Sequence, residues 1–237
     1  MKTLNKVFGF AFLALSVAVL TSCRIVDKEA TGKQVTISQS LKPYKQILCS
    51  GDMDVTFVQS DSAYVVIKGD EGLIKRMNVY TRREGELVID NRGDDKNHVS
   101  INLFSAGKDG MNVTIYGPAP EKLVLAGSGD LLVKPVKTGA MEISVAGSGD
   151  IQLNAFQGGK LRVNLAGAGD VTAKKINAKS VECAVAGSGD VEMELDHSGK
   201  VDCNVAGAGD ITLTGTCKNV SSSVSGAGNV TNNTREY

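Results

Sequence analysis

Acidic side chains that recur at a fixed interval in the second half of the chain are the first candidates for chemistry. They follow Gly-Ser-Gly or Gly-Ala-Gly turns twenty residues apart, at Asp130, Asp150, Asp170, Asp190 and Asp210. Carboxylates stacked at strand spacing repel by roughly 1 kcal/mol per pair even in water, so each needs a hydrogen bond, water or a cation. We favour capping of backbone N–H groups and predict no metal site; a calcium ladder is the alternative, with few ligands per ion.

The turn residues around these aspartates are predicted to be structural. Stacked corners call for backbone at φ > 0 and leave little room for a Cβ, which favours glycine. A sixth copy, one residue shorter, has Asn229 in the aspartate position. The predicted turn glycines are Gly127, Gly129, Gly147, Gly149, Gly167, Gly169, Gly187, Gly189, Gly207, Gly209, Gly226 and Gly228.

Four further cysteines follow Cys23, and they form no CxxC pair and no metal-ligand spacing. Cys183 and Cys203 are one period apart, so they should be neighbours in one inward column, within disulfide range. Their positions correspond to Ile143 and Val163 in earlier copies, which favours buried free thiols. A disulfide is the alternative, since an exported protein can be oxidised.

The remaining reactive side chains do not form a recognisable catalytic set, and we predict no cofactor. His98 and His197 lie in expected turns without a nearby nucleophile pattern. Glu192 and Glu194 are expected on a solvated outer strand face. Arg92-Gly93-Asp94 spells an integrin-binding tripeptide, but its neighbours have ordinary turn composition.

Apolar residues alternate with polar ones on both sides of each turn, which indicates strands. Val181, Cys183 and Val185 precede one turn, and Val191 and Met193 follow it. Two short strands per twenty residues cannot bury enough surface alone, so the copies must stack. The sequence therefore predicts an all-β, single-stranded parallel β-helix (β-solenoid), right-handed, flattened into two sheets, with about 20 residues per coil.

The N-terminus has the features of an export signal. Lys2 and Lys6 precede an apolar run that is too short to span a bilayer comfortably. The run ends in Leu20-Thr21-Ser22-Cys23, which resembles a bacterial lipoprotein box and implies lipidation of Cys23. We expect an outer-membrane lipoprotein, facing the periplasm or the cell surface, held by its lipid.

The chain is expected to divide into a signal peptide (1–22), a lipidated cysteine with a tether (23–34), degenerate solenoid coils (35–118) and the regular repeat (119–237), the last two forming one continuous fold. Ile47 to Val55 contains a worn copy of the turn. Loss of Lys2 and Lys6 from 26 basic residues leaves 24 against 26 acidic ones, which argues against nucleic-acid binding.

The worn segment at 50–73, the GELVID stretch at 85–90 and the GSGD/GAGD array together resemble the auto-transporter adhesin head domain, or GIN domain, of Bacteroidetes and their relatives. The resemblance covers about residues 35–230. It implies a pectin-lyase-like β-helix without that superfamily's catalytic residues, and a role in adhesion. No binding residue carries over from it, and the GSGD positions match as turns only.

These observations favour a non-catalytic protein that binds, adheres or supports the cell envelope. Its expected partners are the membrane, through the lipid, and a glycan, host matrix or envelope protein; oligomers are possible. The alternative is a carbohydrate-active β-helix enzyme, a polysaccharide lyase or hydrolase. Catalysis needs a concave site with convergent titrating groups, and the uniform coils do not predict one.

Overall fold

The computed structural model describes residues 31–91 and 111–237. The predicted signal peptide, Cys23 and most of the tether lie outside the described residues, as do Arg92-Gly93-Asp94 and His98. In the part of the chain that is described, no helix is long and apolar enough to cross a membrane.

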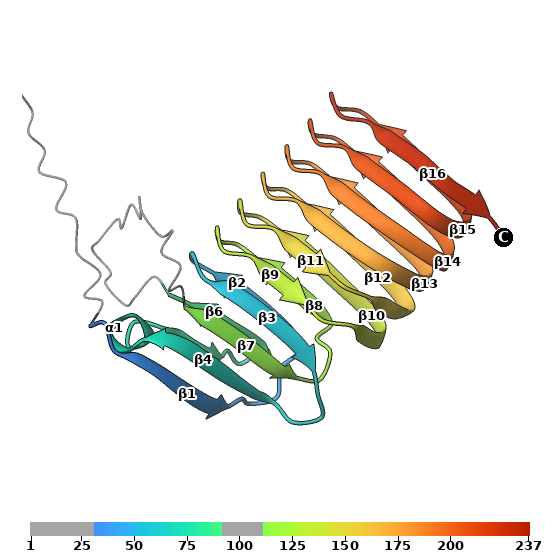
Figure 1. Ribbon diagram of the computed structural model, residues 1–237. Coiled ribbons are helices and arrows are strands. Elements are labelled where there is room, and N and C mark those ends of the chain that lie inside the picture. Colours follow the sequence, from blue (N-terminus) through green and yellow to red (C-terminus); the bar gives the residue numbers. More distant parts are fainter. Residues whose placement is uncertain (1–30, 92–110) are drawn as a thin grey trace, which may run out of the picture.

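A stack of coils forms the body of the molecule (Figure 1). Each coil has one arm before its glycine turn and one arm after it, and each arm pairs in parallel with its copy in the next coil. Val163 lies between Ile143 and Cys183, and Ile151 lies between Leu131 and Val171. The predicted all-β solenoid with about 20 residues per coil is confirmed.

The strands sort by their position relative to the turn. Strands before it are β2 (Gln46–Ser50), β6 (Glu86–Asp90), β8 (Lys122–Leu125), β10 (Val136–Val145) and β12 (Phe156–Leu165). Strands after it are β3 (Asp54–Gln59), β7 (Asn112–Gly117), β9 (Leu131–Val133), β11 (Ile151–Leu153) and β16 (Val230–Glu236). Three long strands serve both arms: β13 (Val171–Val185), β14 (Val191–Val205) and β15 (Ile211–Val224).

The core consists of aliphatic columns that run along the stack. Every second side chain of each arm points inward, and one such column contains Leu123, Ile143, Val163, Cys183 and Cys203, all at most 1% exposed. Burying each of these side chains contributes roughly 1.5–3 kcal/mol. Because a column is shared between coils, no single coil is stable without its neighbours.

At the N-terminal end, the order of strands in space differs from their order in the chain. β6 and β7 form a rung below β2 and β3, and β8 and β9 lie above them. The remaining elements close this end: β4 (Tyr64–Asp70) is antiparallel to β7, β1 (Gln34–Ser40) to β4, and β5 (Asn78–Thr81) to β6. The four-residue helix α1 (Glu71–Ile74) joins β4 to β5.

Residues 35–118 are therefore only partly the degenerate coils that we expected. β2–β3 and β6–β7 are rungs of the stack, whereas β1, β4 and β5 are antiparallel edge strands. In β4, Val65 and Ile67 alternate with outward residues as they would in a coil. Alternation reports which face of a strand is buried, but it does not report the direction of the neighbouring strand.

The C-terminal end closes by a change of side chains in the last rung. Ser222 pairs with the inward Cys203, and Asn232 pairs with the inward Leu213. Both polar residues are exposed, and Val224, in the column of Val205, is 45% exposed. Polar residues thus replace apolar ones at two inward positions of the terminal rung, which reduces the apolar surface available to a further coil.

The turn glycines are required by the closeness of successive coils. A Cβ placed on Gly167 would overlap the carbonyl oxygen of Gly147, and the glycines of the other repeat turns meet the turn beneath them in the same way. The expectation of φ > 0 at these positions is wrong: among the corner glycines only Gly51 in the N-terminal copy, with φ of 109°, lies in the left-handed region. Steric room selects glycine in the repeat.

This difference predicts the effect of two matched substitutions. Gly167→Ala should lower the free energy of unfolding by about 1–3 kcal/mol, because the coils must move apart to admit the methyl group. Gly139→Ala should change it by less than about 0.5 kcal/mol, since a Cβ there meets no atom within 4 Å. Chemical denaturation followed by circular dichroism measures both. Equal losses in the two variants would contradict the steric explanation.

Candidate functional site

The aspartate column is a ladder of hydrogen bonds between coils. The Oδ1 atom of each aspartate accepts the backbone N–H of the aspartate one coil further on. The N–Oδ1 distances are 3.0 Å for Asp150 to Asp130, 2.8 Å for Asp170 to Asp150, 2.8 Å for Asp190 to Asp170 and 2.7 Å for Asp210 to Asp190. Capping therefore takes place, but the capped N–H group belongs to the next coil and not to the same turn.

Each corner also carries a main-chain bond in the opposite sense. The N–H of Ile151 donates to the carbonyl of Asp170 at 2.8 Å, while the N–H of Asp170 donates to the side chain of Asp150. The carboxylate thus replaces the carbonyl that would accept this N–H in a continuous parallel strand. The column continues the sheet through the turn, which is a structural role.

The ladder begins at an aspartate outside the regular repeat and ends at an asparagine. At the first turn, the N–H of Asp130 donates to Asp54 at 3.1 Å, so Asp54 and not Asp52 occupies the aspartate position. The Ser-Gly-Asp at 50–52 resembles the repeat, yet the strand register places Gly51 beside Gly127. At the last turn, the backbone N–H of Asn229 donates to Asp210 Oδ1 at 2.8 Å. The side-chain amide of Asn229 donates to the Thr231 hydroxyl.

A metal centre needs several ligand side chains within reach of one ion. Within 31–91 and 111–237, no three His, Cys, Asp or Glu side chains are grouped so that they could hold a metal ion. In the aspartate column, one oxygen of each carboxylate is already engaged by a backbone N–H group.

Cys183 and Cys203 are buried, as predicted. Cys183 and Cys203 are paired in register on adjacent strands, and both are free thiols, as are Cys49 and Cys217. Burial raises the pKa of Cys183 well above its usual range and raises the pKa of Cys203 to about 12. Such thiols are protonated and inaccessible, so they act as core residues and not as nucleophiles.

His197 and the glutamates of β14 lie at the surface. Glu192 and Glu194 are exposed on the outer face, as expected. His197 lies in a bend with φ of 53°, its Nδ1 is 2.7 Å from Asp196 Oδ1, and the Tyr237 hydroxyl donates to its carbonyl at 2.9 Å. The Tyr237 hydrogen bond fastens the C-terminal residues to a coil two periods earlier.

A polar face on the arms before the turn is the strongest candidate for a binding site. We define it by two outward rows that run across β8, β10, β12, β13 and β14. The first row is Lys122, Glu142, Arg162, Glu182 and Asp202, and the second is Val124, Ser144, Asn164, Ala184 and Asn204. The strand register fixes the spacing of these side chains along the stack.

Ion pairs hold the first row of the polar face in place. Lys122 Nζ lies 2.8 Å from Glu142 Oε1, and Arg162 Nη2 lies 2.6 Å from Glu182 Oε2. Glu182 also pairs with Lys160. Hydrogen bonds from Lys160 and Arg162 lower the pKa of Glu182, and the bond from Lys122 lowers the pKa of Glu142. Both carboxylates are therefore ionised at neutral pH.

A shallow hollow lies on the polar face, where the short side chain of Ala184 stands between two asparagines. Its volume is about 190 Å³, and it is lined by Arg162, Asn164, Glu182, Cys183, Ala184, Asp202 and Asn204. Amide, carboxylate and guanidinium groups surround it, so it offers both donors and acceptors. A bound molecule would lie along the outer surface of three neighbouring strands.

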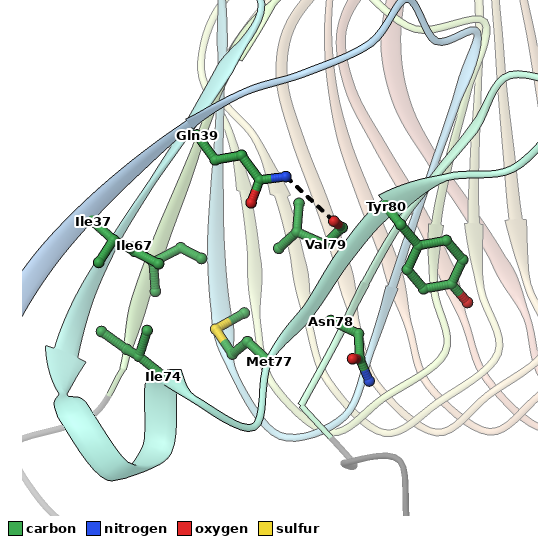
Figure 2. Close-up of a pocket in the computed structure, with 8 residues that line it drawn as sticks. All are labelled: Ile37, Gln39, Ile67, Ile74, Met77, Asn78, Val79 and Tyr80. Carbon is green, nitrogen blue, oxygen red and sulfur yellow. Dashed lines mark hydrogen bonds between the residues drawn. The ribbon is translucent and has the colours of Figure 1, made fainter.

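A second hollow lies at the N-terminal end, between the two faces of the solenoid (Figure 2). Its volume is about 290 Å³, and apolar residues outnumber polar ones among those that line it: Ile37, Gln39, Ile67, Ile74, Met77, Asn78, Val79 and Tyr80. The Gln39 side chain crosses it and donates to the Val79 carbonyl at 3.4 Å. We call it the end pocket.

Reasoning from the sequence found the turn column but missed both hollows. The first row of the polar face was visible in principle, because Lys122, Glu142, Arg162, Glu182 and Asp202 are also twenty residues apart. The end pocket had no such signal, since it combines β1, β4, α1 and β5, which meet only after antiparallel pairing.

The chain belongs to the family described as "Putative auto-transporter adhesin, head GIN domain", whose sequence model matches residues 43–233. The resemblance drawn from the repeat is thus confirmed. The search among curated proteins found no match.

Solved structures of bacterial proteins share the fold. A "putative adhesin" from Bacteroides fragilis is 22% identical, with a TM-score of 0.64 over 86% of this chain and 98% of that one. A "putative lipid binding protein" from Parabacteroides distasonis is 24% identical, with a TM-score of 0.65 over 86% and 98%. A "putative adhesin" from Parabacteroides merdae is 17% identical, with a TM-score of 0.61 over 86% and 97%.

The aspartate ladder predicts a graded response to substitution. Asp170→Ala removes the acceptor for the N–H of Asp190 and should lower the free energy of unfolding by about 1 kcal/mol. Asp170→Asn keeps Oδ1 and should stay within about 0.5 kcal/mol of the parent protein. Denaturant titration of the three proteins gives both values. If the column bound calcium, millimolar calcium would raise the melting temperature of the parent protein but not that of Asp170→Ala. We expect calcium to leave the melting temperature of both proteins unchanged.

The ion pairs of the polar face predict a dependence on pH. The folded-state pKa of Glu182 is lowered, so its contribution to stability is present above the unfolded value of about 4.3 and is lost as the pH falls through the folded value. Glu182 and its partners are well exposed, so Glu182→Gln should cost less than about 1 kcal/mol at pH 7. Thermal melts of both proteins across pH should converge in acid. A difference that persists or widens there would contradict the ion-pair assignment.

Proposed function

We propose that this protein is an exported lipoprotein of the outer membrane, anchored through Cys23, that acts as a non-catalytic adhesion module. The polar face binds an extended polymer, and a glycan fits it best. The observation that carries the proposal is the hollow over Ala184, bordered by a fixed row of ion pairs and by the amides of Asn164 and Asn204. Host matrix or envelope proteins that carry such glycans are then the partners.

The chemistry of the polar face suits hydroxyl-rich chains. Glu182 and Asp202 are balanced by Lys160, Arg162 and Lys200, so the hollow has no large charge of one sign. The amide groups donate and accept hydrogen bonds, the carboxylates accept them, and sugar hydroxyls can do both in return. Since parallel strands hold these groups, little side-chain freedom is lost on binding.

The ionisation of Glu182 supports binding over catalysis. A glycosidase needs one carboxylic acid whose pKa is raised toward neutrality so that it can protonate the leaving group. The pKa of Glu182 is lowered by Lys160 and Arg162, which is the opposite direction. The acid and arginine that border the hollow are thus partners of each other, and they keep the surface in one arrangement.

Relatives with this fold support adhesion as the class of function. The description of the family names an adhesin, and two of the similar structures are also named as adhesins. Another is named for lipid binding, which agrees with a protein that works at a membrane. For this chain, the lipid anchor would come from Cys23 and would leave the polar face available along the side of the stack.

Filling the hollow tests the proposal. Ala184→Phe places a ring over the space between the asparagines, and we expect it to weaken binding on an array of neutral and acidic glycans by at least about tenfold, or about 1.4 kcal/mol. Thr172→Phe is the matched control, because it adds the same ring to an outward position on the other arm. Binding that survives Ala184→Phe, or is lost equally in both variants, would place the contact elsewhere.

A further inference from the structure

The end pocket gathers apolar surface that the fold leaves uncovered. Four large apolar side chains are exposed in the described part of the chain, and two of them, Ile37 at 40% and Tyr80 at 46%, border this pocket. Figure 2 shows them on opposite sides of it, one from β1 and the other from β5. Met77 lies between them and Ile67 forms part of the buried wall.

The start of the described chain lies at the same end. The backbone N–H of Thr31 donates to Asp70 Oδ1 at 3.0 Å, and Asp70 caps α1 through the N–H of Gly72 at 2.8 Å. Ile74, at the end of α1, lines the pocket. Cys23 precedes Thr31 by eight residues, so the chain between them spans at most about 28 Å.

The opposite end of the solenoid is out of reach of such an anchor. The six repeat turns stand on the two rungs made by β2–β3 and β6–β7, and Figure 1 shows β16 at the far end from α1 and β1. Seven steps of about 4.8 Å put the last rung about 34 Å from the first. A lipid on Cys23 would therefore bring the N-terminal end to the membrane and leave the C-terminal end away from it.

Basic residues are frequent in the segments that adjoin the lining of the end pocket. Lys75, Arg76, Arg82 and Arg83 lie on the segments that follow α1 and flank β5, together with Lys33 beside β1, against Glu71, Glu84 and Glu86. Within the described residues, Arg76 and Arg83 form no ion pair, whereas Lys75 pairs with Glu71 and Arg82 with Glu86. Apolar lining residues with basic residues in the adjoining segments complement the acyl and headgroup layers of an anionic bilayer.

We infer that the end pocket is a membrane-docking surface, which receives lipid of the bilayer that holds the anchor. This inference rests on the proposed lipidation of Cys23. At about 290 Å³ the pocket is at the lower limit of ligand sites, so it takes part of an acyl chain and not a whole lipid. The solenoid then stands on the membrane, with its polar face along the side.

Site-specific fluorescence tests the inference on the full chain. The protein is produced with its signal peptide, recovered as the lipoprotein and reconstituted in vesicles of phosphatidylcholine and phosphatidylglycerol. Ile37→Cys carries a bimane label at the pocket, and Asn233→Cys carries it on β16 as the control. The native thiols Cys49, Cys183, Cys203 and Cys217 are at most 2% exposed and do not compete for the label.

Nitroxide-bearing lipid should quench the label at position 37 by at least about twofold, as expected for a group at the headgroup boundary, and leave position 233 unchanged. Tyr80→Cys gives an independent second position, and thermal melts confirm that each variant folds.

Three outcomes overturn the inference. If the protein floats with the vesicles and carries the lipid mass, but position 37 is quenched no more than position 233, the docking surface is wrong and the anchor stands. If the label at position 37 responds to protein density and not to lipid quencher, a second copy covers the pocket. If the processed protein lacks the lipid mass, the anchor in the proposed function fails, and the docking surface fails with it.

Discussion

Parallel pairing between copies twenty residues apart is the constraint on which the rest of this structure depends. Each arm takes its hydrogen-bond partners from the coil above and the coil below, so the corners must approach as closely as the strands do. Only glycine fits where one turn lies on the carbonyl of the next, as at Gly147 and Gly167. The Gly-x-Gly corner therefore follows from the spacing of parallel strands.

The same register repeats each type of side chain at equivalent positions along the stack. An inward position becomes an apolar column, and an outward charge becomes a row that has to be satisfied along its whole length. The aspartates satisfy theirs by accepting the N–H of the next coil, as Asp170 does for Asp190. The polar face satisfies its own through ion pairs, along the row between Arg162 and Glu182 and from outside the row between Lys200 and Asp202. Where a small residue interrupts a row, as Ala184 does, a hollow appears.

A stack of parallel coils has two ends, and the chain closes them by different means. At the C-terminal end, polar residues such as Ser222 and Asn232 enter positions that are apolar in the coil before. At the N-terminal end, antiparallel strands cover the first rung, yet they leave the two faces apart and the end pocket between them. The difference matters for function, because it makes the two ends chemically distinct and gives the solenoid a direction.

The sequence by itself determined the repeat, the period, the inward columns and the corner glycines, because all of these are local patterns that parallel stacking copies from coil to coil. It also placed Cys183 beside Cys203. Only the tertiary structure decided which strands pair where the repeat pattern is interrupted. It assigned the first corner carboxylate to Asp54, placed β6 and β7 below β2 and β3, and turned β4 antiparallel. Alternating residues define a buried face but not the neighbour or its direction, so only the assembled sheet could bring Ile37 and Tyr80 to one pocket.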